Sequence, residues 1–477
     1  MRKRWSRSSG GRWNSDFTCE AFNCRRHSNV MSAELIEIAE RVTGWGNSDE
    51  QVEAVVTSDR ETEIRAYEGE IESLTVAESQ GIGVRVIKDG RQGFAYAGTL
   101  EENELLEVLN EARDNASFAS PDEFSGLAEP DGVKSVSLEV YSDGVNSLST
   151  SEKIDYALEL EKLTLQTDKR ISGIESSEYT DVVSESAIAT STGIRSSSKE
   201  SGCSLMVYAL AEENNETQTG FGFSIGRSPE ELDIAKAASD ASDRATRMLG
   251  STKPKSERLT VVLDPWVSAQ FLQIVGSTLS AEMVLKGRSL FADRLGEEVA
   301  SPIISLVDDP TNPQAFTATE TDGEGLATRR NVLIENGELK MFLHNVWTAR
   351  KASSTSTGSA IRSYASTPGV GIQAISLNPG GRNPVDLIAG IDNGILIQSV
   401  TGLHSGVNPI SGDFSTGAEG LRISNGELSE PLREFTIGST IQKMLKDVSE
   451  VGNDLEWLPM SSAGSTVVIN ELTVSGA

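Results

Sequence analysis

The chain has 477 residues and a formal net charge of −29, with 37% hydrophobic and 24% charged side chains. This length exceeds what one hydrophobic core usually serves, so we expect two or three domains. The excess of acids repels phosphate backbones and excludes nucleic-acid binding as a main function, and no apolar run reaches the ~20 residues that cross a bilayer. The acidic surplus serves solubility, or it lines a groove that attracts basic peptides.

Residues 1–30 differ in charge from the rest of the chain. They carry seven basic and two acidic side chains, a balance of +5, which leaves −34 for the remainder. They contain no apolar segment of the kind found in signal peptides, and an amphipathic helix is predicted directly after Met31. We therefore interpret residues 1–30 as a non-native or disordered leader, with a targeting tail as the alternative.

The three cysteines, Cys19, Cys24 and Cys203, make neither a disulfide framework nor a zinc motif. This usage fits a reducing compartment. We therefore expect a cytoplasmic protein.

Alternating apolar and polar residues predict strands in a first domain, residues 31–120. The predicted strands are 51–60, 62–68, 71–77, 81–87 and 91–97. Leucine and valine at helical spacing then predict a helix over 101–116, with Thr99 as its N-cap. Strands and helix together indicate an α+β domain.

A segment rich in proline, glycine, serine and acids, 120–133, predicts a linker or a long surface loop. Residues 134–250 then predict a second α+β domain. It has a helix over 151–167 and short polar strands between 171 and 226. A last helix begins at Ser228 and runs to about Leu249, and its first turn is acidic, as the helix dipole prefers.

Residues 256–477 predict a β-rich C-terminal domain. A strand over 258–263 begins it, a helix covers 267–282, and glycine-punctuated strands follow. Asn336-Gly337 and Asn425-Gly426 each predict a type I′ hairpin turn. The expected fold class is therefore multidomain α+β, with mixed, mostly antiparallel sheets and helices.

The segment 399–440 is the densest run of glycines and small polar residues in the chain. Its run GLHSGVNPISGDFSTGA precedes an NGE hairpin and EFTIGST, and glycine permits positive φ and close backbone approach. This run resembles the C-terminal signature of the TldD/PmbA family, in its PmbA (TldE) branch. The segments TARK at 348–351, STG at 356–358 and GNDL at 452–455 support the resemblance, which covers roughly residues 49–477.

The resemblance implies a peptidase of the U62 type, historically called a modulator of DNA gyrase. In this family the TldD branch binds zinc through an H-E-x-x-x-H helix and a third protein ligand, and the PmbA branch lacks the metal site. Zinc catalysis needs imidazole ligands and a carboxylate that takes a proton from metal-bound water. The helix 267–282 would carry the motif, and it places Leu272, Gln273 and Ser277 at the three positions. We therefore expect no catalytic and no metal-binding residue here, and zinc in a TldD-like partner.

The run Gly222-Phe223-Ser224-Ile225-Gly226 matches G-x-S-x-G, the nucleophile-elbow pattern of serine hydrolases, and two histidines, His344 and His404, follow it. An elbow needs an apolar strand before it and a helix directly after it. Residues 212–220 are instead strongly polar. We favour a structural role for Ser224 over the hydrolase alternative.

Five residues are predicted to bind substrate or a partner: His404, Ser405, Asn408, Asp413 and Arg350. The first four lie in the glycine-rich loop, where His404 either fixes the loop through backbone hydrogen bonds or reaches the ligand with the others. Arg350 either holds a peptide carboxylate or a partner's acidic loop, or it is solvated or makes an internal ion pair.

The expected function, which the resemblance implies, is that of a PmbA/TldE-type subunit that is catalytically incomplete alone. It would form a heterodimer with a TldD-like zinc metalloprotease subunit and degrade or trim peptides and unfolded polypeptides. The alternative is a non-catalytic homodimeric peptide-binding protein. A companion chain with the H-E-x-x-x-H motif would discriminate between these two functions.

Overall fold

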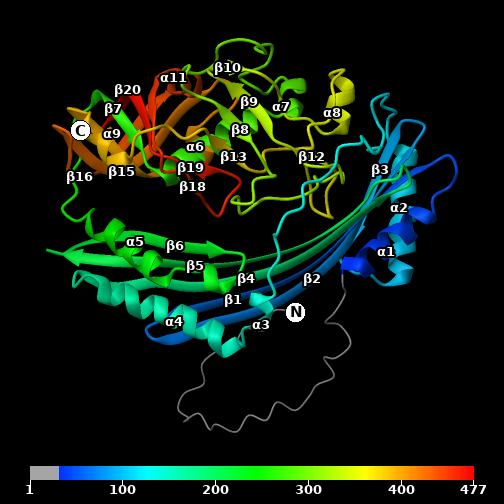
Figure 1. The fold of residues 1–477 in the computed structure, drawn as a ribbon, viewed down its shortest axis with the longest axis horizontal. Coiled ribbons are helices and arrows are strands. Elements are labelled where there is room, and N and C mark those ends of the chain that lie inside the picture. The colour runs from blue at the N-terminus through cyan, green and yellow to red at the C-terminus, as the bar shows by residue number, and fades with distance from the viewer. Residues whose placement is uncertain (1–31) are drawn as a thin grey trace, which may run out of the picture.

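The computed structural model describes residues 32–477, so the predicted leader, 1–30, lies outside the described residues. The first half of this range forms a long curved sheet with helices. The second half forms a compact part that lies within the curve of the sheet (Figure 1). Within 32–477, no helix is both long and apolar enough to cross a membrane.

One antiparallel sheet spans the first half of the chain, in the order β3-β2-β1-β4-β5-β6. The strands are β1 (Gln51–Tyr67), β2 (Glu70–Lys88), β3 (Arg91–Ala97), β4 (Ile171–Thr190), β5 (Arg195–Glu213) and β6 (Glu216–Gly226). Because β1 pairs with both β2 and β4, the predicted domains 31–120 and 134–250 share a single sheet. The limits of these two domains stay a prediction.

The strands are longer than their sequence patterns predicted. The predicted segments 51–60 and 62–68 are one strand, as are 71–77 and 81–87, because the cross-strand register runs on through Arg60 opposite Glu78. The strands predicted as short between 171 and 226 are 20, 19 and 11 residues long. Polar residues interrupt the alternation without ending the ladder of backbone hydrogen bonds.

Helices cover one face of this sheet in two places. They are α1 (Ser32–Gly44), α2 (Glu102–Phe118), α4 (Thr150–Thr167) and α5 (Ile234–Thr246), with the short α3 (Gly144–Ser147) and η1 (Pro229–Glu231). Val52 and Val56 of β1 pack with α1 and α2, and Ile64 packs with α4 and α5. Side chains alternate along a strand, so Glu53 and Val55 face the opposite side, toward the second half of the chain.

Two predicted helix starts are wrong. The N-cap residue of α2 is Glu101, and Thr99 instead accepts the Glu101 backbone N–H with its hydroxyl. The helix predicted from Ser228 is divided into η1 and α5, because the Asp233 side chain accepts the Lys236 N–H and so caps a new helix.

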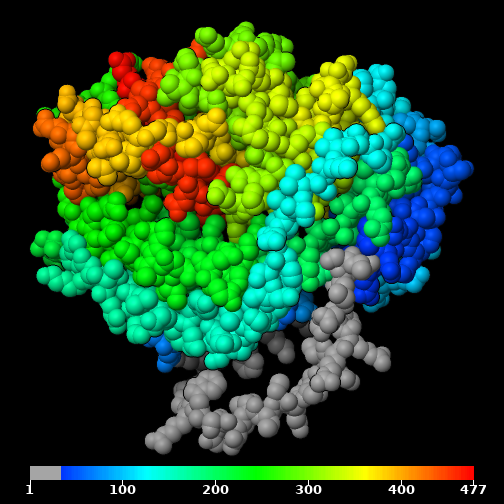
Figure 2. Space-filling view, in the orientation of Figure 1, coloured from blue at the N-terminus to red at the C-terminus, as the bar shows by residue number. Residues whose placement is uncertain are grey.

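The segment 119–143 contains neither helix nor strand and crosses the molecular surface as a strap, drawn in cyan (Figures 1 and 2). Leu127 and Ala128 within it are fully buried. Further along, the Leu138 N–H donates to Glu320 Oε1 at 2.8 Å. The predicted linker is therefore a fastened surface segment that ties the sheet to the second half of the chain.

The second half contains many short elements around a barrel. They are β7 (Glu257–Leu263), α6 (Pro265–Thr278), α7 (Ala281–Leu285), β8 (Leu306–Asp308), β9 (Asn331–Glu335), β10 (Glu338–Leu339), α8 (Val346–Lys351), β11 (Ala360–Ile361), β12 (Gly369–Val370), β13 (Ile375–Leu377), α9 (Pro384–Ala389), β14 (Asn393–Thr401), α10 (Leu403–Gly406), β15 (Asp413–Ser424), β16 (Glu427–Thr440), α11 (Ile441–Lys446), β17 (Val448–Val451), β18 (Glu456–Trp457), β19 (Ala463–Gly464) and β20 (Val467–Ser475). The strand order is β16-β15-β14-β7-β20-β17, and β16 also pairs with β20. That extra pairing closes the sheet into a barrel.

The fold class predicted from the sequence, multidomain α+β with mostly antiparallel sheets, is confirmed. Both predicted hairpin turns also have the two positive φ values of a type I′ turn, at Asn336-Gly337 and Asn425-Gly426. The predicted helix 267–282 is divided into α6 and α7. It starts earlier than predicted, because Asp264 caps it.

Candidate functional site

The helix that would carry a zinc motif is α6, which packs against the barrel. The Asp264 carboxylate accepts the Val267 N–H at 2.8 Å and fixes the start of the helix. Leu272 is only 2% exposed and belongs to the main core, whereas Gln273 is half-buried and Ser277 is exposed. The helix reads PWVSAQFLQIVGST and contains no histidine, cysteine or acid. No shift of the alignment within α6 supplies a zinc ligand, so these residues do not fit the metal.

Among residues 32–477 no group of three or more histidine, cysteine or acidic side chains is arranged to hold a metal ion. His344, which lies just before α8, is buried. Its backbone N–H donates to Thr357 Oγ1 at 2.8 Å, and its Nδ1 lies 3.3 Å from Thr348 Oγ1. Burial lowers the pKa of His344, so the imidazole is neutral and helps to order the start of α8.

The glycine-rich loop brings four of the predicted residues to one exposed part of the surface. His404 and Ser405 lie in α10, which follows Gly402 at a φ of 76°. Ser405 Oγ donates to the Gly402 carbonyl at 3.2 Å, and within the described chain the exposed His404 side chain makes no hydrogen bond or ion pair. Leu403 and Val407 pack on the barrel core, so the loop is anchored while its polar side chains stay exposed.

Asn408 and Asp413 shape the second half of this loop. Asn408 Oδ1 accepts the N–H groups of Ile410 and Ser411 at 2.9 and 3.2 Å. Ser411 Oγ donates to Asp413 Oδ2 at 2.6 Å. The loop therefore presents an imidazole and a carboxylate on an ordered turn. These groups can hydrogen-bond to a polypeptide, but they form no pair of nucleophile and base.

Arg350 is used inside the chain. Its Nη2 donates to the Leu127 carbonyl of the strap at 2.9 Å. A Cβ placed on Gly126 would lie 2.1 Å from Arg350 Nη1, so a larger residue there would displace the end of the Arg350 side chain. The geometry corresponds to the internal role considered from the sequence, with a backbone carbonyl as the partner instead of an acid.

Ser224, the serine of the G-x-S-x-G run, lies within the antiparallel strand β6 and not at a turn between strand and helix. Its Oγ accepts the Asp233 N–H at 2.8 Å. A Cβ on Gly222 would lie 1.9 Å from the Ala237 carbonyl of α5. The glycine and serine therefore serve the packing of α5 on β6, and the geometry is not that of a nucleophile elbow.

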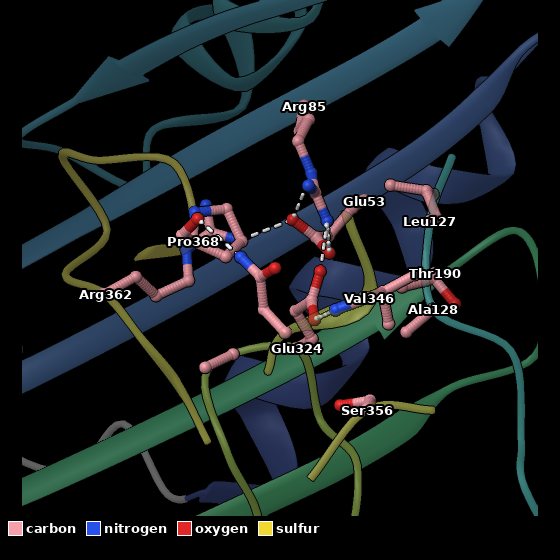
Figure 3. Close-up of polar contacts among 12 residues, drawn as sticks. Glu53, Arg85, Leu127, Ala128, Thr190, Glu324, Val346, Ser356, Arg362 and Pro368 are labelled. Atoms are coloured by element: carbon pink, nitrogen blue, oxygen red, sulfur yellow. Dashed lines mark hydrogen bonds and ion pairs between the residues drawn. The ribbon is translucent and has the colours of Figure 1, made fainter. Parts of the chain in front are cut away.

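A buried group of four charged side chains joins the sheet to the second half of the chain (Figure 3). Arg85 Nε and Nη2 donate to Glu53 Oε1 and Oε2 at 3.0 and 2.7 Å. Arg362 also donates to Glu53, and Glu324 Oε1 lies 3.6 Å from Arg85 Nη2. Glu324 Oε2 accepts the Val346 N–H at 2.8 Å, which caps the start of α8. We call these four residues the buried charge cluster.

The cluster sets the ionisation of its members. Burial alone would raise the pKa of Glu53, but the charges of Arg85 and Arg362 hold it below its usual value. Burial raises the pKa of Glu324 against the effect of Arg85. The nearby Asp322, buried beside Glu324, has its pKa raised to about 7. The cluster is therefore a balanced set of charges that holds two parts of the molecule together.

This cluster was not predicted from the sequence, although a signal for half of it exists. Glu53 lies in the apolar run VEAVV, and Arg85 lies in the apolar run GVRVI. The two residues are direct cross-strand partners in the β1–β2 hairpin. Opposite charges that face each other inside two apolar strands predict a buried ion pair.

Comparisons with known proteins cover most of the described chain. Three family models match in succession: the PmbA/TldA metallopeptidase domain 1 over residues 52–116, the central domain over 143–249 and the C-terminal domain over 256–476. The metalloprotease PmbA of Escherichia coli O157:H7 is 25% identical over 434 residues, which are 90% of this chain and 93% of that protein.

Solved structures give the same result. A Thermotoga maritima protein, named as a candidate modulator of a DNA gyrase, matches with a TM-score of 0.85 and 27% identity, over 92% of this chain and 99% of that chain. TldE from Thermococcus kodakarensis matches with a TM-score of 0.83 and 24% identity, over 94% and 100% of the two chains. At this identity the second likeness concerns the fold alone.

Proposed function

The chain belongs to the PmbA/TldD metallopeptidase family, and from this premise we propose that it is a PmbA/TldE-type subunit of a two-subunit peptidase. In this proposal the chain lacks the catalytic metal itself. A TldD-like subunit with an H-E-x-x-x-H helix supplies the zinc, and the complex degrades or trims peptides and unfolded polypeptides in the cytoplasm.

The observation that carries the proposal is the composition of α6. A zinc peptidase needs three protein ligands and a base near the metal-bound water. The helix offers only apolar, amide and hydroxyl side chains, and Leu272 is packed into the core. The surrounding barrel is closed and has a buried core. This supports a stable subunit in which core residues occupy the positions of the metal ligands.

The proposed role of the chain is to hold the partner and to shape the shared cavity. The exposed loop with His404, Ser405, Asn408 and Asp413 is a suitable contact surface for the partner, because rigid strands position the loop and these side chains are exposed. Loops of this kind carry little of the packing energy, so they are available for recognition.

The experiment that tests this proposal is reconstitution. The chain is purified alone, dialysed against a mild chelator, and mixed with a TldD-like subunit that carries the H-E-x-x-x-H motif. Zinc is measured by elemental analysis, association by light scattering, and activity with an unstructured peptide. We expect stoichiometric zinc only with the partner, a heterodimer, and faster cleavage by the mixture than by either chain.

One zinc per chain in the isolated protein would contradict the proposal, and so would cleavage by the isolated chain that a chelator abolishes. A stable homodimer that binds peptides and ignores the TldD-like subunit would instead support the non-catalytic alternative. A TldD-like subunit in which the motif glutamate is replaced by glutamine is the matched control, because it should assemble without cleaving.

A further inference from the structure

A cavity of about 310 Å³ lies where α5 and β6 of the sheet meet the start of α6 and the strand β14 of the barrel. This volume is in the range of small-molecule sites, roughly 300–1,000 Å³. Figure 2 shows the seam between these parts, where green residues of the sheet half meet orange and red residues of the barrel half. None of the five residues predicted to bind substrate or a partner lines this cavity.

One wall of the cavity is aromatic because of the alternation along β6. Gly222 faces α5, so Phe221 and Phe223 face the barrel half. Their ring centroids lie 4.9 and 5.3 Å from the ring of Trp266, at the start of α6. We call Phe221, Phe223 and Trp266 the aromatic wall. It offers a surface on which a ring or a large apolar side chain packs.

A buried amide faces the same cavity. Gln398 on β14 is only 8% exposed. Within residues 32–477 its side-chain amide makes no hydrogen bond, and it is not one of the fully buried unpartnered groups, so it stays accessible from the cavity. An amide that faces a cavity bonds to water or to a ligand. Gln398 is therefore available to a polar molecule in the site.

Most of the charges around the cavity are already paired. Lys236 Nζ lies 2.9 Å from Asp240 and 3.3 Å from Glu456. Arg244 Nη2 lies 3.4 Å from Asp264, and its guanidinium also stacks over the ring of an aromatic-wall residue at 4.5 Å. These contacts set two cations against three acids, so the paired groups carry a net charge of −1. The unpaired charged groups that line the cavity are Arg247 and Asp454.

Arg247 is the cation that remains. Its side chain is exposed, its Nε donates to the Asp243 carbonyl at 2.9 Å, and neither terminal nitrogen has a hydrogen-bond or ion-pair partner within the described chain. A guanidinium with both terminal nitrogens free matches the two oxygens of a carboxylate. On the barrel side, each oxygen of Asp454 accepts a hydrogen bond from Thr466, one from the N–H and one from the hydroxyl, and Asp454 forms no ion pair within the described chain. The cavity therefore presents a cation and an acid that take part in no ion pair.

We propose that this cavity binds a short zwitterionic peptide whose last residue is aromatic or large and apolar. The apolar side chain packs on the aromatic wall, and the terminal carboxylate is held by Arg247. The amide of Gln398 hydrogen-bonds to the peptide, and the acid at Asp454 balances the ammonium group. The proposal goes beyond the proposed function, because it needs neither cleavage nor a partner subunit and is tested on this chain alone.

The test is isothermal titration calorimetry with the purified full chain and four probes. The probes are glycyl-phenylalanine, the same dipeptide as its C-terminal amide, glycyl-glycine and inorganic phosphate. We expect glycyl-phenylalanine to bind. The amide should bind about tenfold to hundredfold more weakly, because it loses a charge-assisted hydrogen bond. Glycyl-glycine and phosphate should bind weakly or not at all.

Two variants locate the binding. Arg247→Gln should weaken the binding of glycyl-phenylalanine about tenfold or more. The dipeptide and its C-terminal amide should then bind with equal affinity. The matched control is Arg195→Gln, since Arg195 is an exposed arginine that pairs with Glu40 elsewhere on the sheet, and it should leave binding unchanged. Circular dichroism checks that both variants are folded.

Absence of heat with glycyl-phenylalanine overturns the proposal, as does equal affinity of the wild-type chain for the acid and the amide. Unchanged binding by a folded Arg247→Gln variant overturns it too. Tighter binding of phosphate than of the dipeptide would show a general anion site and would likewise refute the proposal of a peptide site. None of these results depends on whether the chain assembles with a TldD-like subunit.

Discussion

Glu53 on β1 and Arg362 after β11 lie 309 positions apart and form an ion pair whose side chains are 0% and 2% exposed. Arg85 completes the contact from β2 and shares the same carboxylate. The sheet half and the barrel half are thus joined through one buried carboxylate. A pair of this kind matters most when one partner is lost, because the remaining charge stays buried without compensation.

Glu53→Gln should therefore destabilise the protein by about 3–5 kcal/mol. The amide keeps the shape of the side chain but leaves two guanidinium groups with only Glu324 to oppose them. The control is Glu159→Gln, which breaks an exposed pair with Lys162 on α4 and should cost about 1 kcal/mol or less. Urea unfolding measures both. Equal stability of the two variants would show that the cluster contributes no more than a surface pair.

Asp308→Asn should make the protein more stable near pH 7.5. One oxygen of Asp308 accepts the N–H groups of Gln373 and Ala374 at 2.9 and 2.7 Å, and the other is buried without a hydrogen-bond partner in the described chain. Burial raises the pKa of Asp308 from 3.8 to about 6. Asparagine keeps the accepting oxygen and carries no charge.

The sign of this effect follows from proton binding. Between pH 4 and pH 6 the folded state holds a proton on Asp308 that the unfolded state has lost, so stability falls as the pH rises. Two pKa units correspond to about 3 kcal/mol. The advantage of Asp308→Asn should therefore be small at pH 4.5 and grow to about that value at pH 7.5, as measured by urea midpoints. An advantage that does not change with pH would contradict this assignment.

Gly222→Ala should be far more harmful than Ser224→Ala. The new Cβ would lie 1.9 Å from the Ala237 carbonyl, so α5 must move away from β6 at a cost of about 1–3 kcal/mol or more. Ser224→Ala leaves the Asp233 N–H without its acceptor and should cost about 1–2 kcal/mol. Thermal unfolding compares the two. Loss of peptide cleavage by the mixed complex with a folded Ser224→Ala variant would revive the hydrolase alternative.

His404→Ala and Asp413→Ala test the glycine-rich loop. Both side chains are exposed, so each isolated variant should keep its circular dichroism spectrum and melt within a few degrees of the wild type. Under the proposed function, cleavage by the mixed complex should fall about tenfold, because the loop then contacts the partner or the shared cavity. Lys162→Ala on the far side of the sheet is the control and should retain activity. Full activity of both loop variants would show that the loop has only a structural role.

Local patterns in the sequence were sufficient for several features. The dipeptides Asn336-Gly337 and Asn425-Gly426 determine their hairpin turns, because positive φ at two successive positions depends on the residues themselves. The absence of any zinc donor from α6 is equally a property of the sequence, since no packing can turn leucine or glutamine into a ligand. The alternation of apolar residues likewise indicated the strands of the sheet. The predicted strands end too early where the exposed face of the sheet tolerates polar residues.

Other features depended on the tertiary structure. The closure of the barrel through β16 and β20, the strap that Arg350 fastens, and the ion pair between Glu53 and Arg362 all join segments far apart in the chain. Periodicity and turn preferences act over a few residues, so they determine which faces are apolar but not which distant segment covers them. The partners of a buried charge are decided only when the whole chain packs, because the energy that places them comes from desolvation and from neighbours that the sequence does not list side by side.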